Sequence, residues 1–266
     1  MTFLAGRDLV TPATYDVDVI VVGSGAGGSS CARALAAAGR SVLVVEEGAD
    51  HQPPDFDQRE ENMIPALFRE MGGQRTDDLA VLVLSGKGVG GSTTHNTNLV
   101  KRLAPEIVAQ WRDDLGLGGL DDESLGALFS EVEALLGVRA IEPERLSPHN
   151  AVMKRGVDAL GWRGGMLSHN RDGRCIGSGF CELGCAYDGK LNARRVVLPA
   201  ASSAGATIVA DARVTRIVHD GTRVSGIEAT LLDAVGLPRG SLAARAPVVV
   251  LAASAIGSPT LAIRSD

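Results

Sequence analysis

The chain has 266 residues, of which 45% are hydrophobic and 33 are glycine, so it can bury a core in one large or two interleaved domains. Its net charge of -6 provides no basic field for a nucleic-acid partner, and its longest apolar runs fall short of the roughly 18 residues that a membrane helix needs. With four cysteines, too few for a disulfide scaffold, and no leader-like start, we expect a soluble, cytoplasmic protein without membrane contact.

The first predicted unit is a strand, a glycine turn and a helix. Asp16–Val22 is apolar and β-branched, as in a buried parallel strand. The motif Gly23–Gly28 follows it and leads into an alanine-rich stretch that reaches Ala38 without a proline. Gly39 then stands where a helix commonly ends on glycine. This order is typical of a dinucleotide-binding fold.

Each residue of this motif has a physical role. Gly23 allows a tight turn, Gly25 lets the backbone approach a pyrophosphate, and Gly28 lets the helix lie close to the strand. A second strand at 42–45 delivers Glu46, whose carboxylate accepts hydrogen bonds from ribose hydroxyls and repels a 2′-phosphate. The motif alone is weak evidence, but this context favours FAD or NAD over NADP.

A second glycine-rich loop follows in the sequence. A short helix is expected around Arg59–Met71, and the apolar run Leu79–Leu84 predicts a strand that leads into the loop. Four glycines occur between Gly86 and Gly91, and hydroxyl and amide side chains come directly after them. Such a backbone is suited to lie against a flat polar ligand.

This second loop resembles a signature of the glucose-methanol-choline (GMC) flavoprotein oxidoreductases. The matching residues are Gly86-Lys87-x-Val89-Gly90-Gly91-Ser92-Thr93, with Asn96 following. The spacing from Gly28 to Glu46 is similar to that family as well. The resemblance extends over about residues 15–265 and covers only the N-terminal half of a typical member.

The resemblance implies FAD as the cofactor and oxidation of a small-molecule alcohol by hydride transfer to the flavin. In the family the first loop holds the pyrophosphate, the acid holds the adenosine ribose, and the second loop lies along the isoalloxazine ring. A backbone contact to adenine is also implied. These roles fall on Gly23, Gly25, Gly28, Glu46, Gly90, Gly91, Ser92, Asn96 and Val214.

His95 departs from the usual family pattern, in which an aliphatic residue occupies this position. Choline oxidases and pyranose oxidases look similar here and bond this histidine covalently to the flavin. Two interpretations therefore stay open: a histidyl-FAD link through His95, or a histidine that only hydrogen-bonds near the ring.

The predicted FAD-binding domain is discontinuous, with parts at 14–104 and 190–266, and residues 105–189 form a helical and loop excursion towards the substrate region. Acidic residues at 121–123 predict a helix start, and a second helix is expected at 148–160. Trp111 and Trp162 are expected to anchor the packing. An apolar stripe in the first of these helices predicts a buried face, formed by Leu125, Leu128, Phe129, Val132, Leu135 and Leu136.

Three of the four cysteines, Cys175, Cys181 and Cys185, lie within eleven residues of one another. Their spacing matches neither a zinc pattern nor a familiar ferredoxin pattern, so no metal site is predicted. An iron–sulfur cluster, a disulfide and free structural thiols all stay open for them.

Several strands are expected in the last part of the chain. Residues 206–210, 212–218 and 224–230 predict antiparallel strands around a hairpin that turns at Asp220-Gly221. Residues 248–253 predict another buried strand, and the segment Ser254–Leu261 looks like the start of the second GMC signature.

The predicted fold is α/β: a doubly wound, Rossmann-like FAD-binding domain with antiparallel strands and a helical excursion, in which the C-terminal half of the family fold is missing. The resemblance places the catalytic base in that half, so no catalytic residue is assigned, and an exposed sheet edge is expected. The expected function is the FAD-binding portion of an alcohol oxidase or dehydrogenase. The alternatives are a catalytically incomplete fragment, a subunit completed by a second chain, and an NAD-dependent dehydrogenase, which leaves the second glycine loop unexplained.

Overall fold

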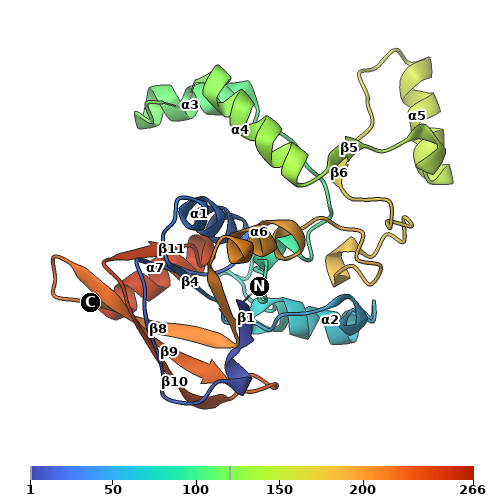
Figure 1. Ribbon diagram of the computed structural model, residues 1–266. Coiled ribbons are helices and arrows are strands. Elements are labelled where there is room, and N and C mark those ends of the chain that lie inside the picture. Colours follow the sequence, from blue (N-terminus) through green and yellow to red (C-terminus); the bar gives the residue numbers. More distant parts are fainter. Residues whose placement is uncertain (1, 120) are drawn as a thin grey trace. The chain divides into compact units, whose positions relative to one another are not determined.

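The computed structural model describes residues 2–119 and 121–266 and divides into two compact units (Figure 1). Unit 1 comprises the chain up to Asn96 together with Phe180–Asp188 and Asn192–Asp266. Unit 2 comprises Thr97–Gly179 and Gly189–Leu191. The chain therefore leaves and re-enters unit 1, which carries both glycine loops.

A five-stranded parallel sheet forms the centre of unit 1. Two of its three inner strands, β3 (Val19–Val22) and β4 (Val42–Val45), are buried at every residue, which explains their uniformly apolar, mostly β-branched sequences. The strands lie in the order β1 (Thr2–Ala5), β7 (Thr207–Ala210), β4 (Val42–Val45), β3 (Val19–Val22) and β11 (Val248–Leu251). The predicted α/β class is confirmed.

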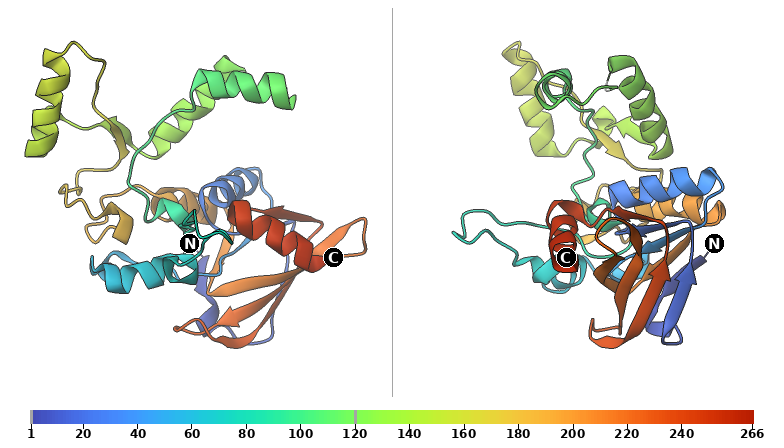
Figure 2. Two further views of the ribbon diagram at one scale, coloured as in Figure 1. Left: turned by 180° about the vertical axis from the view of Figure 1, so that it is seen from behind. Right: turned by 90° about the vertical axis from the view of Figure 1, so that its left-hand side faces the viewer.

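Both faces of this sheet are covered. On one face, α1 (Ala26–Ala37) and α6 (Leu198–Ser203) pack their alanine and leucine side chains against alternate residues of β3, β4 and β7. On the other face lie a four-stranded sheet and Leu261 of α7 (Ser254–Ser265). Figure 2 shows α7, in red, alongside this second sheet. Successive side chains of the inner strands therefore point to opposite faces of the sheet and pack into two separate hydrophobic cores.

The second sheet has the order β2 (Ala13–Asp16), β10 (Pro238–Arg245), β9 (Val224–Leu232) and β8 (Ala212–His219). β8 and β9 are antiparallel, which confirms the predicted hairpin. Asp220 holds its turn by accepting hydrogen bonds from the backbone N–H groups of Thr222 and Arg223, and these bonds lower the pKa of Asp220 to about 2. The next strand, β10, was not predicted.

Three strand predictions need correction. β7 is parallel to β1 and β4 rather than part of the antiparallel hairpin, because it completes the central sheet. Residues 79–84 form no strand: a single bridge pairs Arg75 with Leu82, and most side chains of the segment are exposed. β11 is at the edge of its sheet, so Val248 is 47% exposed rather than buried.

The remaining helices are α2 (Glu60–Leu67) in unit 1 and α3 (Pro105–Leu115), α4 (Asp122–Leu135) and α5 (Pro148–Ala159) in unit 2, which also holds a small sheet of β5 (Val138–Ala140) and β6 (Ser168–Asn170). Of these helices, α2, α4 and α5 lie where helices were predicted, whereas α3 was not predicted. Asp121 caps α4 by accepting a hydrogen bond from the Ser124 N–H at 2.7 Å.

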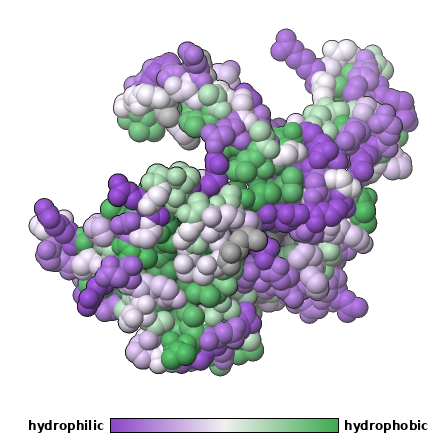
Figure 3. Space-filling model, in the orientation of Figure 1, coloured by the Kyte–Doolittle hydropathy of each residue, from purple (hydrophilic) through white to green (hydrophobic). Residues whose placement is uncertain are grey.

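The predicted buried stripe of α4 is wrong in part, because Leu128 is 56% exposed and Val132 is 46% exposed. The expected anchoring by Trp162 is also wrong, since this side chain is 67% exposed. Apolar side chains therefore reach the surface on the helices of unit 2, as the green residues in Figure 3 illustrate.

Candidate cofactor site

The first glycine turn joins β3 to α1 and has the geometry that its sequence predicts. Gly23 has a φ of +96°, a conformation that side-chain-bearing residues rarely adopt. A β-carbon on Gly28 would lie 1.9 Å from the carbonyl oxygen of Gly23. Gly25 is the N-cap of α1, so the first N–H groups of a 12-residue helix open at this turn. Such a helix start favours a phosphate group.

Glu46 follows β4 and is buried, with 6% of its surface exposed. One carboxylate oxygen accepts hydrogen bonds from the N–H and the hydroxyl of Ser24, at 3.0 and 2.7 Å. The other accepts from the N–H groups of Gly48 and Gly88, at 3.1 and 3.2 Å. Burial raises the pKa of Glu46, while the bonds from Ser24 and Gly48 oppose this effect. The side chain therefore connects both glycine loops to the end of β4.

The two glycine loops touch each other through their backbones. A β-carbon on Gly91 would lie 2.8 Å from the Cα atom of Gly25, and the Gly90 N–H donates to the Ser24 hydroxyl at 3.0 Å. Gly90 and Gly91 both have positive φ values, +94° and +53°. The loops are about sixty residues apart in sequence, so this close approach is a property of the tertiary fold.

The predicted residues that follow the second loop differ in their surroundings. Ser92 accepts a hydrogen bond from the Gly86 N–H at 3.0 Å and so stabilises the loop. His95 is 4% exposed, and its ring lies 4.1 Å from that of Phe68, centroid to centroid. A β-carbon on Gly86 would lie 2.5 Å from His95 Nε2, so the imidazole packs directly on the loop backbone. Asn96 is exposed.

Val214 reaches the same region through its strand. It lies in β8 and pairs with Ala229 of β9. β8 begins at Ala212, whose N–H donates to the carbonyl oxygen of Glu46 at 2.9 Å. Val214 therefore lies two residues from a backbone hydrogen bond to the Glu46 carbonyl, and its contact with adenine stays a prediction.

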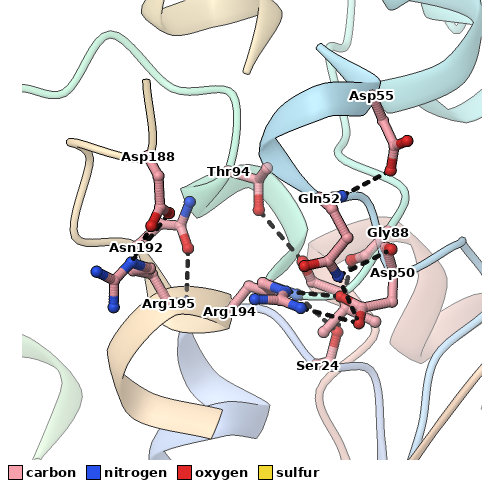
Figure 4. A network of polar contacts seen from close by, with 12 residues as sticks. Ser24, Asp50, Gln52, Asp55, Gly88, Thr94, Asp188, Asn192, Arg194 and Arg195 are labelled. Carbon is pink, nitrogen blue, oxygen red and sulfur yellow. Dashed lines mark hydrogen bonds and ion pairs between the residues drawn. The ribbon is translucent and has the colours of Figure 1, made fainter. Parts of the chain in front are cut away.

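Sequence reasoning missed the residues that brace these loops, which Figure 4 shows in part. Arg194 pairs with Asp50 through two contacts of 2.7 and 3.1 Å, and Asp50 also accepts a hydrogen bond from the Gln52 amide. A β-carbon on Gly90 would lie 3.0 Å from the Arg194 backbone nitrogen. Asp50 and Arg194 are 144 positions apart, so no local pattern indicated the pair. Ser24, by contrast, stands inside the first motif.

The cysteine-rich loop does not form a metal site in the part of the chain that the structure describes. No three His, Cys, Asp or Glu side chains there lie close enough together to hold a metal ion. Cys175 belongs to a different compact unit from Cys181 and Cys185. The cluster, disulfide and thiol interpretations of these three cysteines stay predictions.

Among the helices of residues 2–119 and 121–266, none has the length and apolar character needed to cross a bilayer.

Residues 17–266, nearly the whole chain, match the family model described as GMC oxidoreductase. The chain belongs to the GMC oxidoreductase family. It corresponds to the N-terminal region of that family, which is the family's FAD-binding domain. The resemblance inferred from the two glycine loops and the acid is thereby confirmed.

This chain covers only part of the length of similar GMC proteins. It is 34% identical over 257 residues to an uncharacterised GMC-type oxidoreductase of Mycobacterium tuberculosis, covering 96% of this chain and 40% of that protein. It is 29% identical over 206 residues to a long-chain-alcohol oxidase of Arabidopsis thaliana, covering 76% of this chain and 27% of that protein. This GMC chain thus spans well under two thirds of the length of these relatives.

A solved structure confirms the fold. The crystal structure of pyridoxine 4-oxidase from Mesorbium loti aligns with a TM-score of 0.68 at 21% identity, covering 93% of this GMC chain and 51% of that chain. At this identity the likeness concerns the fold alone.

Proposed function

We propose that this chain is the FAD-binding portion of a GMC-type oxidoreductase that oxidises an alcohol, a CH–OH donor, by hydride transfer to the flavin. The observation that carries the proposal is the backbone contact between Gly25 and Gly91, with Glu46 bonded to both loops. Two glycine loops held together beside a helix N-terminus provide donors for a dinucleotide. The similarity to a long-chain-alcohol oxidase favours an alcohol as the substrate class.

The residues present fit the parts of FAD by their chemistry. The N-terminus of α1, opened by Gly23 and Gly25, offers N–H groups and a positive dipole end for the pyrophosphate. Glu46 is an anionic acceptor of the kind that ribose hydroxyls need, and the backbone of Val214 is assigned to adenine. The loop residues Gly90, Gly91, Ser92 and Asn96 are assigned to the isoalloxazine ring. When bound, FAD would supply the acceptor for the substrate hydride.

The proposal is tested by binding. The purified 266-residue chain is titrated with FAD and, separately, with NAD, and ligand that stays bound after gel filtration is identified by its absorption spectrum. We expect FAD to be retained at about one molecule per chain and NAD to pass through. Retention of NAD but not of FAD would support the NAD-dependent dehydrogenase instead. Binding of neither would contradict a nucleotide-binding role.

We further propose that His95 carries the flavin covalently, through a bond from a ring nitrogen that would replace a C–H bond of the flavin 8α methyl group, with the flavin itself as the two-electron oxidant. The support is its place directly after the second glycine loop and its burial beside Phe68. We expect flavin colour to stay with the protein after acid denaturation and centrifugation of the holoprotein. In the variant His95→Ala the colour is expected in the supernatant. The matched control His169→Ala, a change in unit 2, should keep it in the pellet. Flavin that leaves the wild-type chain would exclude the link.

Catalysis is proposed to require the part of a GMC protein that these 266 residues do not cover. The support is that the Mycobacterium tuberculosis relative is more than twice as long, since 40% of it is covered. Alcohols are therefore expected to leave the flavin of the isolated holoprotein oxidised, and to bleach its visible absorbance once a C-terminal GMC half is added. Bleaching by the isolated chain would contradict this.

We also propose a cytoplasmic location for the protein. The support is its low cysteine content, which is typical of proteins in a reducing compartment.

A further inference from the structure

Ser24 lies between the first two glycines of the first motif, and its hydroxyl is part of a connection between three segments. It donates to Glu46 Oε2 at 2.7 Å and accepts from the Gly90 N–H at 3.0 Å. The residue is fully buried, with 0% exposure, and Gly90 is buried as well. One hydroxyl group thus bonds the turn after β3 both to the acid after β4 and to the second glycine loop.

The two bonds of this hydroxyl differ in how easily the structure replaces them. Glu46 keeps three other donors if the hydroxyl is removed, namely the N–H groups of Ser24, Gly48 and Gly88. For the Gly90 N–H, the Ser24 hydroxyl is the acceptor that the structure shows, and a buried N–H group without an acceptor is costly. Loss of the hydroxyl therefore acts mainly on the second loop.

We propose that Ser24 is a positioning residue, which holds the second glycine loop against the first in the arrangement that receives the flavin half of the cofactor. This inference rests on the proposed FAD-binding function. The inference predicts different effects on the two halves of FAD. The contacts to adenosine and pyrophosphate are supplied by α1 and Glu46, and only the contacts to the flavin half depend on the loop that Ser24 anchors. A residue with a general stabilising role would weaken both halves alike.

The test compares FAD with ADP, a probe that carries the adenosine ribose and a pyrophosphate but no isoalloxazine ring. Dissociation constants for both are measured by calorimetry on the ligand-free 266-residue chain carrying His95→Ala, and on the same chain with Ser24→Ala added, because a covalent bond through His95 would remove the binding equilibrium of FAD. We expect the constant for FAD to rise about tenfold in the variant and that for ADP to stay within about threefold. Ser30→Ala is the matched control, because Ser30 is an exposed serine in α1 that bonds only the Ala26 carbonyl oxygen among its recorded contacts, and both constants should be unchanged.

A second measurement does not depend on the cofactor. Hydrogen exchange followed by mass spectrometry on the ligand-free protein should show peptides over 86–92 exchanging about tenfold faster in Ser24→Ala than in wild type. Ser24→Cys, which retains the side-chain shape with a weaker hydrogen-bonding group, is expected to show the same changes at smaller size and provides the test if the alanine variant does not fold.

Parallel losses of FAD and ADP affinity, or unchanged exchange over 86–92, would overturn the positioning role while leaving the proposed function intact. A wild-type chain that binds neither FAD nor ADP would instead overturn the proposed function, and this inference with it. The two failures are therefore distinguishable from the wild-type measurements alone.

Discussion

Gly28→Ala is expected to abolish FAD binding and to lower the free energy of unfolding by about 3 kcal/mol. The added β-carbon would lie 1.9 Å from the Gly23 carbonyl oxygen and 3.2 Å from the Ala252 β-carbon. Because the Gly23 oxygen is a backbone atom, the clash is relieved only if the turn opens and α1 moves away from β3. Urea denaturation of the ligand-free chain measures the stability, and titration with FAD measures the binding.

Gly27→Ala is the matched control for this prediction. Gly27 is the neighbouring residue in the same motif, is exposed, and has no atom within 4 Å of the position where a β-carbon would stand. Because it lies in α1, alanine should leave the stability unchanged or raise it by up to about 1 kcal/mol. Equal effects at 27 and 28 would mean that the close approach of Gly28 to Gly23 does not govern this turn.

Glu46→Gln is expected to lower the free energy of unfolding by about 2 to 3 kcal/mol and to weaken FAD binding at least tenfold. All four recorded partners of the carboxylate donate to it: Ser24 through its N–H and hydroxyl, and Gly48 and Gly88 through their N–H groups. A glutamine presents an NH₂ group at one end, so in either orientation at least one backbone N–H faces another donor. Burial makes such a mismatch costly.

Glu47→Gln provides the comparison at the adjacent position. Glu47 forms ion pairs with Arg69 at 2.8 Å and Arg213 at 3.4 Å, and its side chain is 21% exposed. Ion pairs that solvent reaches contribute little, so we expect a change of about 1 kcal/mol or less and unaltered FAD affinity. If the two glutamine variants behave alike in thermal unfolding and FAD titration, the specific role of the Glu46 hydrogen bonds is excluded.

Local sequence patterns were sufficient for the elements of the first motif. β3 and β4 are buried strands because they are continuous β-branched runs, and α1 begins and ends where Gly25 and Gly39 allow it. The hairpin at Asp220 was recognised in the same way. In each case the residues that decide the conformation lie within a few positions of one another.

The same reasoning failed where burial depends on distant partners. The apolar runs at 79–84 and in α4 were predicted as a strand and as a buried helix face, yet their side chains are largely exposed or half-buried. An apolar pattern states that a segment can be buried, but a covering element is needed to bury it. Strand direction depends on distant partners as well: β7 was predicted as part of an antiparallel hairpin, but it pairs in parallel with β1 and β4.

Local patterns are enough to predict the α/β class, the βαβ unit with its glycine turn, and the candidate residues of both loops, because turn geometry and strand burial are encoded locally. The folded chain alone reveals that Gly25 lies against Gly91, that Ser24 and Glu46 bond to the second loop, and that Asp50 pairs with Arg194. These contacts join segments that are 42 to 144 positions apart. Their partners are chosen by the packing of the whole sheet, which no local pattern specifies.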